Sequence, residues 1–372
     1  MRRLNKELLK NHLIRRTEAD IADGRVGGVS VSVWQDGEEA FSHYFGETNE
    51  RTMFRMASMT KPVTAVATMI TVERGLLSLD DPIEKYLPEF TNMRVAVCDE
   101  SGEVIGEEPA RRSLTPRLLL AHSSGLDYDG PCCKEFSNMT DEERLTMENS
   151  VAACARMHLS FQPGESQGYS HTVAWDPLLT IIQNLTGEDY AEFITKEIFV
   201  PCGMVDTTYT PSDEQYSRMI PMHDFIDGKA TTVELQKGWY TCFPNTHYLG
   251  CAGLYSTLPD YIKFALMLQN GGEINGHRIL SEKSVREIAT PQLSESANPG
   301  GQPWGLAVRV IRGDDERLPE GTFGWSGAYG THFWVDPENR ITAVYMKNSH
   351  YDRGHTAVTA AHFEEDVMAA LE

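Results

Sequence analysis

The most informative stretch of the sequence reads Phe54-Arg-Met-Ala-Ser58-Met-Thr-Lys61-Pro-Val-Thr-Ala-Val-Ala-Thr-Met-Ile70. Its second half predicts a helix with one apolar face, because apolar residues recur at i, i+3, i+4 and i+7: Val63, Val66, Ala67 and Ile70. Ser58 and Lys61 precede this face with the spacing Ser-x-x-Lys. Residues three apart lie on one face of a helix, within side-chain reach of each other. The stretch therefore predicts a hydroxyl beside an amine where a helix begins.

This pairing has a specific chemical use. A serine hydroxyl is a poor nucleophile at neutral pH and needs a base beside it. A lysine can be that base when burial and nearby positive charge lower its pKa. The helix start adds free N–H groups and a positive dipole end, which favour developing negative charge. Ser-x-x-Lys also fits a helix-capping serine followed by a solvated lysine, so the rest of the chain has to discriminate between the two interpretations.

Composition excludes several classes of function. The chain has 372 residues, a net charge of −21 and 41% hydrophobic residues, which argues for one or two globular domains and against binding to nucleic acid or to an anionic membrane. The N-terminal leucines make an amphipathic stripe typical of a folded helix, not of a signal peptide. Seven cysteines without a CxxC pair favour reduced thiols and a cytoplasmic location. Removal of a leader and the oligomeric state both stay open.

The order of patterns predicts the fold class. Residues 27–34 and 40–46 alternate as a β-hairpin before the Ser58 helix, which ends at Gly75. The chain returns to strand patterns near its end and closes with a helix over about 356–371. We predict an α+β fold, in which helices flank an antiparallel sheet built from both chain ends and a mostly helical domain is inserted. The predicted late strands are 304–311, 322–325, 331–335 and 341–346.

The middle of the chain is predicted to be mostly helical. Helices are expected at 115–125, 141–157, 178–187, 191–198 and 259–270. Residues 91–113 are expected to form a hairpin or loop, 127–139 a loop, and 211–250 are not assigned. We therefore predict a sheet domain from residues 1–80 and 290–372 and a helical domain from 81–289, with an active site in the cleft between them.

Several motifs in fixed order resemble the serine β-lactamase and penicillin-binding-protein superfamily, with the class C β-lactamase fold. Besides the Ser58 stretch they are Gly75-Leu-Leu-Ser-Leu-Asp-Asp-Pro82, Leu119-Leu-Ala-His-Ser-Ser-Gly-Leu126, Pro163-Gly164 before Tyr169-Ser-His171, Gly250-Cys-Ala-Gly-Leu-Tyr-Ser256, Gly324-Trp-Ser-Gly-Ala328 and Phe333-Trp-Val-Asp-Pro337. The Ser-x-x-Lys motif with its companions is an established signature of this group. The resemblance covers nearly the whole chain and is closest to the carboxylesterase and acyltransferase members.

The resemblance implies roles for individual residues. Ser58 would be the acylated nucleophile, Lys61 its proton partner, and Tyr169 the tyrosine of the Tyr-x-Asn motif. A phenolate near a lysine ammonium can accept the serine proton and later return it to the leaving group. Whether Lys61 or Tyr169 is the acylation base stays open. The backbone N–H groups of Ser58 and Ala328 would form the oxyanion hole, with Ala328 on an edge strand.

Two departures from the family pattern bear on the substrate. His171 stands where class C β-lactamases have asparagine, and Trp325-Ser326-Gly327 stands where they have Lys-Thr-Gly or a relative. We expect these four residues to bind substrate. Tryptophan offers one indole donor and no charge, so it favours an apolar acyl or alcohol group over a carboxylate. The expected activity is that of a carboxylesterase or acyl-transferring esterase on small esters.

Other hypotheses remain. One is a β-lactamase or a D-amino-acid peptidase or amidase, and another is a non-catalytic sensor or binding module. Gly164-Glu-Ser166-Gln-Gly168 matches the Gly-x-Ser-x-Gly pattern of another hydrolase fold, but that motif requires an apolar strand before it and a helix directly after it. The spacing of histidines and cysteines does not match a zinc site. We expect no metal and no cofactor, and a small ester or amide as the binding partner.

Overall fold

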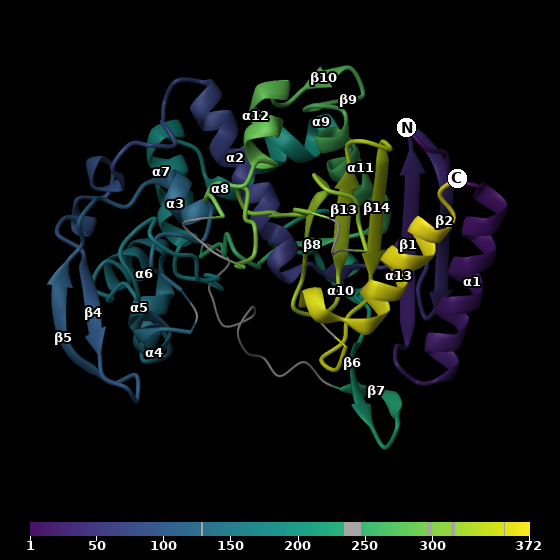
Figure 1. The fold of residues 1–372 in the computed structure, drawn as a ribbon, viewed down its shortest axis with the longest axis horizontal. Helices are drawn as coiled ribbons and strands as arrows, with labels where there is room; N and C mark the ends of the chain where they lie inside the picture. The colour runs from purple at the N-terminus through teal and green to yellow at the C-terminus, as the bar shows by residue number, and fades with distance from the viewer. Residues whose placement is uncertain (128, 234–246, 296–299, 314–316, 353) are drawn as a thin grey trace.

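The computed structural model describes residues 1–372 except 128, 234–246, 296–299, 314–316 and 353 (Figure 1). Its α-helices are α1 Lys6–Ala22, α2 Lys61–Glu73, α3 Pro116–Leu120, α4 Pro131–Ser137, α5 Asp141–Leu145, α6 Met147–Cys154, α7 Asp176–Thr186, α8 Tyr190–Ile194, α9 Val200–Cys202, α10 Asp213–Ser217, α11 Leu258–Gln269, α12 Glu282–Ile288 and α13 Val358–Ala369. Short 3-10 turns are η1 Ala57–Thr60, η2 Ile83–Lys85, η3 Pro88–Phe90 and η5 Gly354–Thr356, and η4 Thr195–Phe199 is a π-helix.

The strands are β1 Gly28–Gln35, β2 Glu38–Gly46, β3 Phe54–Arg55, β4 Arg94–Cys98, β5 Val104–Pro109, β6 Met222–Ile226, β7 Lys229–Val233, β8 Tyr255–Ser256, β9 Glu273–Ile274, β10 His277–Arg278, β11 Arg309–Val310, β12 Phe323–Ser326, β13 His332–Asp336 and β14 Ile341–Met346. Six of them form one antiparallel sheet in the order β11-β12-β13-β14-β1-β2. The first strand of the chain pairs with the last, with Ser30 opposite Met346. Figure 1 shows these purple and yellow strands side by side.

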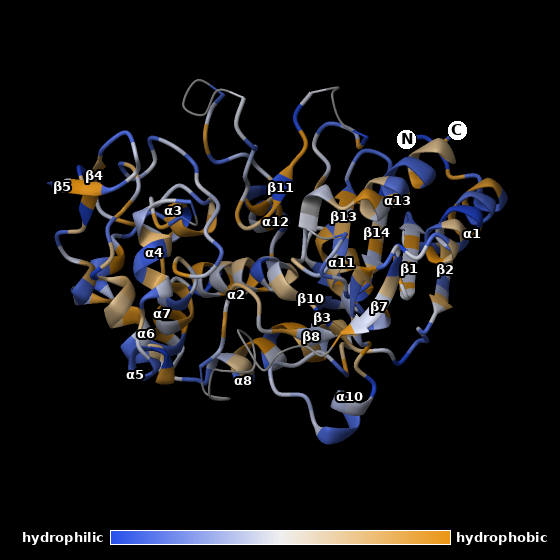
Figure 2. Cartoon of the chain, turned by 90° about the horizontal axis from the view of Figure 1, so that it is seen from below, coloured by the Kyte–Doolittle hydropathy of each residue, from blue (hydrophilic) through white to orange (hydrophobic). Residues whose placement is uncertain are grey.

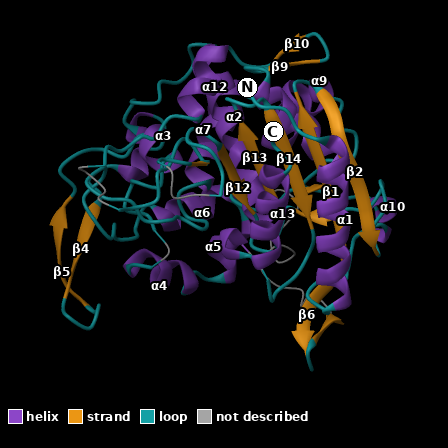
Figure 3. Ribbon diagram, turned by 45° about the vertical axis from the view of Figure 1, so that its right-hand side comes forward, coloured by secondary structure: helices purple, strands orange, loops and turns teal. Residues whose placement is uncertain are grey.

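The six-stranded sheet separates two hydrophobic clusters, because successive side chains of a strand point to opposite faces. On β14, Ile341, Ala343 and Tyr345 belong to one hydrophobic cluster, while Val344 and Met346 belong to the other. Side chains of a strand alternate between faces, so each cluster covers one side of the sheet. α1 and α13 pack on the first side (Figure 3). α11 packs on the second side. Hydrophobic colour follows β13 and β14 in Figure 2, and hydrophilic colour covers most of α1. The predicted α+β fold class is confirmed.

The helical part differs from the prediction in several places, of which three concern residues 116–157. Residues 131–137 form α4 where we expected a loop, because Cys132 and Phe136 are buried one helical turn apart. The helix expected over 141–157 is two helices, since Thr146 has extended backbone (φ −132°) and its side chain caps α6. The helix that starts at Pro116 ends at Leu120, well before Gly125.

The strand predictions also need correction. The strand expected over 304–311 is reduced to β11, although 322–325, 331–335 and 341–346 match β12, β13 and β14 within one or two residues. The unassigned segment 211–250 contains α10, β6 and β7, and its part 234–246 lies outside the described residues. α11 packs on the sheet although the predicted division assigned it to the helical domain, and that division stays a prediction. No helix among the described residues has the length and apolar character to cross a membrane.

The hairpin of β4 and β5 is attached to α4 through His158. The ring Nε2 lies 3.1 Å from Glu107 Oε2 of β5, and Nδ1 lies 2.6 Å from Glu135 Oε1 of α4. The hydrogen bond with Glu135 raises the pKa of His158, and Glu107 adds to this effect. Since the folded pKa is raised, the stabilisation is fully present below the ordinary value of 6.5 and is lost as pH rises through the folded value.

We therefore predict that His158→Gln lowers the free energy of unfolding by about 0.2–1 kcal/mol at about pH 6 and by less at about pH 9. Urea unfolding of both proteins at the two pH values measures this difference. A loss that is equal at both pH values would show that the charge of His158 contributes nothing.

Candidate active site

Ser58 lies in η1, the turn that leads directly into α2. A 3-10 turn has about three residues per turn, so side chains at i and i+3 eclipse. This geometry brings Lys61 Nζ to 3.1 Å from Ser58 Oγ, and the amine donates to the hydroxyl. Ser58 is partly exposed, whereas Lys61 is fully buried. The structure thus places a reachable hydroxyl over a buried amine, as the Ser-x-x-Lys spacing predicts.

The backbone before Ser58 is strained. Ala57 has φ +46°, in the left-handed region that costs a non-glycine residue about 1–2 kcal/mol. Strained residues of this kind concentrate at functional sites, where the surrounding structure holds them. Here Met56 is held on both sides, because its N–H donates to Leu254 O (3.0 Å) and its carbonyl accepts from Thr331 Oγ1 (3.0 Å). The left-handed backbone of Ala57 turns the chain directly before Ser58.

Lys61 Nζ has two further acceptors. It donates to the carbonyl oxygens of His171 (3.0 Å) and Cys251 (3.1 Å). The ring centroids of Tyr169 and Trp175 each lie 5.1 Å from Nζ. Cys251 and Trp175 were not predicted as site residues. Any residue type has a backbone carbonyl, so the acceptor at Cys251 cannot be predicted from the side chain. Lys61 is therefore fixed between Ser58 and Tyr169 by segments more than a hundred residues away.

Tyr169 lies in an aromatic cluster. Trp325 Nε1 donates to the Tyr169 hydroxyl at 3.0 Å. Trp304 stacks on the Tyr169 ring, with centroids 5.4 Å apart and ring planes 22° from parallel, and it meets Trp325 edge-on at 4.4 Å. Tyr169 and Trp325 were predicted as site residues, but Trp304 was not, because its position depends on long-range packing. The Tyr169 hydroxyl thus accepts a hydrogen bond from Trp325, and the Tyr169 ring is packed against Trp304.

The end of β12 lies against η1. Thr331 Oγ1 donates to Met56 O, and Gly327 N–H donates to Thr331 O at 2.7 Å. A Cβ at Gly327 would come within 2.4 Å of Met56 O, so a side chain does not fit there. Ala328 lies in the turn after β12, not on an edge strand as predicted, since the strand ends at Ser326 and is flanked by β11 and β13. The oxyanion-hole role of the Ser58 and Ala328 N–H groups stays a prediction.

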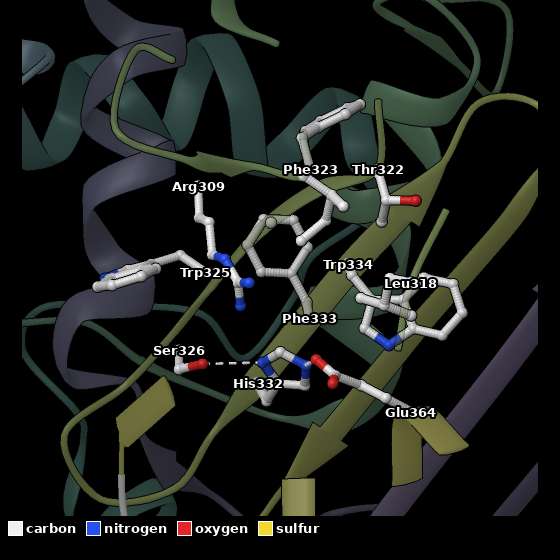
Figure 4. A pocket seen from close by; sticks show the side chains of 12 residues that line it. Arg309, Leu318, Thr322, Phe323, Trp325, Ser326, His332, Phe333, Trp334 and Glu364 are labelled. Carbon is white, nitrogen blue, oxygen red and sulfur yellow. Dashed lines mark hydrogen bonds and ion pairs between the residues drawn. The ribbon is translucent and has the colours of Figure 1, made fainter. Parts of the chain in front are cut away.

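Ser326 points to the opposite side of β12 from Trp325, because side chains alternate along a strand. Its hydroxyl lies 2.8 Å from His332 Nδ1, and His332 Nε2 lies 3.1 Å from Glu364 Oε1 of α13 (Figure 4). The order serine, histidine, glutamate matches that of a hydrolytic triad. However, Ser326 is only 3% exposed, and the cavity beside it measures about 20 Å³, room for about one water molecule. An acyl group does not fit there, so this chain of hydrogen bonds links β12 to α13.

His171 provides a carbonyl and a neutral ring. Its carbonyl accepts from Lys61, and its ring meets that of Tyr169 edge-on with centroids 4.9 Å apart. Burial lowers the pKa of His171 to about 4, and the charge of Lys61 adds to this. The imidazole is therefore uncharged at neutral pH, with one donor and one acceptor nitrogen. Direct substrate binding by His171, Trp325 and Gly327 stays a prediction, and for Ser326 the prediction is limited to its backbone, because the hydroxyl faces the small cavity beside His332.

Two other sequence features can be placed. The Gly164–Gly168 segment lies in a loop, and no helix begins until α7, so the strand–turn–helix context of a nucleophile elbow is missing around Ser166. Within the part of the chain that the structure describes, no group of three or more histidine, cysteine, aspartate or glutamate side chains could hold a metal ion.

Comparison with known proteins agrees with this geometry. The profile of the Beta-lactamase family matches residues 13–365. The chain belongs to the Beta-lactamase family. This membership confirms the resemblance based on motifs and supports a serine hydrolase in general terms.

The family relatives include esterases. An uncharacterized protein of Mycobacterium tuberculosis is 32% identical over 79% of this chain and 77% of its own length. Esterase EstB of Burkholderia gladioli is 27% identical over 82% and 79%. Among solved structures, EstCE1, described as a hydrolase with promiscuous acyltransferase activity, superimposes with a TM-score of 0.81 at 20% identity and covers 98% of this chain and 99% of its own. At that identity EstCE1 supports the fold alone.

Proposed function

We propose that this protein is a serine carboxylesterase, or an acyl-transferring esterase, that acts on small esters through an acyl-enzyme on Ser58. The observation that carries the proposal is the position of Lys61 Nζ, 3.1 Å from Ser58 Oγ and 5.1 Å from the Tyr169 ring centroid. Acyl transfer needs a nucleophile and a group that accepts and returns its proton, and the Ser58 hydroxyl with the Lys61 amine or the Tyr169 phenol can supply both. The relatedness to Esterase EstB supports an ester as substrate.

In the acylation step, Ser58 Oγ attacks the ester carbonyl carbon and loses its proton to a base. Lys61 fits this role in its neutral form, since two N–H groups would serve the His171 and Cys251 carbonyls and the lone pair would face Ser58. Tyr169 fits it as a phenolate beside the Lys61 ammonium and the Trp325 N–H. In either case the proton then passes to the departing alkoxide, which leaves as an alcohol.

In the deacylation step, water or a second alcohol attacks the acyl carbon. The same base takes a proton from the attacking oxygen, and Ser58 Oγ is reprotonated as its bond to the acyl group breaks. Donors at the oxyanion would stabilise both steps, and the loss of one such donor typically costs about 100- to 1,000-fold in rate. The Ser58 and Ala328 N–H groups are our candidates.

The residue at position 325 supports an ester over a β-lactam. Its indole N–H is used by the Tyr169 hydroxyl at 3.0 Å, so it tunes the phenol instead of pairing with a substrate carboxylate. Trp304 and Trp325 pack beside the Tyr169 ring and are only 4% and 6% exposed, so the surroundings of the phenol are apolar and favour uncharged, apolar acyl or alcohol groups.

We predict that the protein hydrolyses p-nitrophenyl butyrate with a kcat/KM at least about 100-fold above that for nitrocefin. Nitrocefin carries a carboxylate, and the protein has the uncharged Trp325 where a cation would be needed to pair with it. Parallel steady-state assays of the two chromogenic substrates measure the ratio. Faster turnover of nitrocefin would favour the β-lactamase alternative. Turnover of neither substrate, together with no labelling of Ser58 by a fluorophosphonate, would favour the non-catalytic alternative.

A further inference from the structure

One residue holds both chain neighbours of Tyr169. Gly168 N–H donates to the carbonyl oxygen of His122 at 2.9 Å, and Ser170 N–H donates to the ring Nδ1 of the same histidine at 3.0 Å. Residues 164–170 contain no helix or strand, so the position of the phenol depends on such contacts. His122 therefore fixes the backbone on either side of the proposed proton-transfer residue.

His122 is itself held rigidly. It follows α3, and its own N–H donates to Leu119 O at 3.3 Å. Its backbone adopts φ +56°, a left-handed conformation that asparagine tolerates better than most residues. The side chain is 1% exposed, and its ring lies 4.5 Å from the Tyr169 centroid and 4.3 Å from the Trp304 centroid. Because His122 is held in this way, its contacts also fix the position of Tyr169.

The two ring nitrogens of His122 have different surroundings. Nδ1 accepts from Ser170 N–H, so in a neutral ring the proton is on Nε2. Burial holds the pKa of His122 well below its ordinary range, and the charge of Lys61 adds to this. Nε2 is buried and has no hydrogen-bond partner among the described residues. A hydrocarbon side chain would fill this space without leaving a donor unpaired, so what the histidine contributes is the acceptor at Nδ1.

We propose that His122 is a positioning residue, whose Nδ1 acceptor sets the phenol of Tyr169 against Lys61 and Ser58. The proposal rests on the proposed esterase function, since it requires Tyr169 to transfer protons. His122 has no part in the chemistry. If the acceptor is lost, the Gly168–Ser170 backbone shifts, and a displacement of about 1 Å at a reacting group can cost about 100-fold in rate.

Two variants of similar size distinguish the effect of the hydrogen-bond acceptor at position 122 from the effect of filling the space that the His122 ring occupies. In His122→Asn, Oδ1 occupies about the position of Nδ1 and tolerates the left-handed backbone, whereas His122→Leu offers no acceptor. We expect His122→Leu to lower kcat for p-nitrophenyl butyrate by about 10- to 100-fold with KM changed less than about threefold. His122→Asn should recover kcat to within about fivefold of the unchanged protein. Equal kcat values in the two variants, at any level, would overturn the proposal.

A measurement on the unchanged protein covers the case in which His122→Leu does not fold. In ¹⁵N-histidine NMR spectra, the signal that disappears in His122→Asn is expected to show a neutral ring with the proton on Nε2. A ring with the proton on Nδ1, or a charged ring, cannot accept from Ser170 N–H and would also overturn the proposal. If the unchanged protein hydrolyses no ester, the proposed function fails, while the NMR result still tests the contact between His122 and Ser170.

Discussion

Ser58→Ala is expected to lower kcat for ester hydrolysis by at least about 10,000-fold, because removal of a nucleophile leaves only binding and electrostatic effects. The change deletes one oxygen from a partly exposed side chain, and among the described residues its hydroxyl is hydrogen-bonded to Lys61 Nζ at 3.1 Å, so the fold should be retained. Steady-state assays with p-nitrophenyl butyrate and thermal unfolding measure both quantities.

The matched control for this variant is Ser166→Ala. Ser166 belongs to the Gly-x-Ser-x-Gly sequence but lies in a loop without the strand and helix of a nucleophile elbow. Activity and fluorophosphonate labelling should survive in Ser166→Ala and disappear in Ser58→Ala. The reverse pattern would mean that the nucleophile has been assigned to the wrong serine.

Tyr169→Phe is expected to lower kcat by about 100- to 10,000-fold, the usual contribution of a positioned proton-transfer group. The variant removes only the hydroxyl that accepts from Trp325 Nε1 and keeps the ring that stacks on Trp304. A phenol that protonates the leaving group matters more when the alcohol is a poor leaving group. The loss should therefore be larger for ethyl butyrate than for p-nitrophenyl butyrate.

Tyr44→Phe is the control for the loss of a phenol hydroxyl. Tyr44 lies on β2, at the opposite end of the sheet order from β11 and β12, and activity should be unchanged in Tyr44→Phe.

Near-normal turnover of both esters by Tyr169→Phe would remove Tyr169 from the mechanism and leave Lys61 as the base. An equal loss for the two esters would restrict Tyr169 to the acylation base and exclude a role in protonating the alcohol.

The parts of the fold that local patterns encode were predicted correctly. The period-two alternation of residues 27–34 and 40–46 predicted the hairpin of β1 and β2, and the strand pattern at 341–346 predicted β14, which pairs with β1 inside the sheet. The Ser58–Lys61 contact follows from a spacing of three residues within one turn. Thr115 and Pro116 mark the start of α3, and the Thr115 side chain accepts from Leu118 N–H.

What the sequence did not reveal depends on contacts between distant segments. α4 has no side-chain cap, and only Pro131 and the buried pair Cys132 and Phe136 indicate it. Trp304 lies in the site because it packs against Tyr169, and nothing near it in the chain indicates this. His122 was predicted only as a member of the Leu119–Leu126 motif, since its contact with Ser170 joins residues 48 positions apart.

The most direct test of the account is to trap the covalent intermediate. The protein is mixed with excess p-nitrophenyl butyrate, quenched in acid during turnover, digested and examined by mass spectrometry. We predict one butyryl group on the peptide that contains Ser58, and none in Ser58→Ala. Turnover without any acylated peptide, or with the butyryl group on another residue such as Ser326 or Ser166, would contradict the proposed role of Ser58.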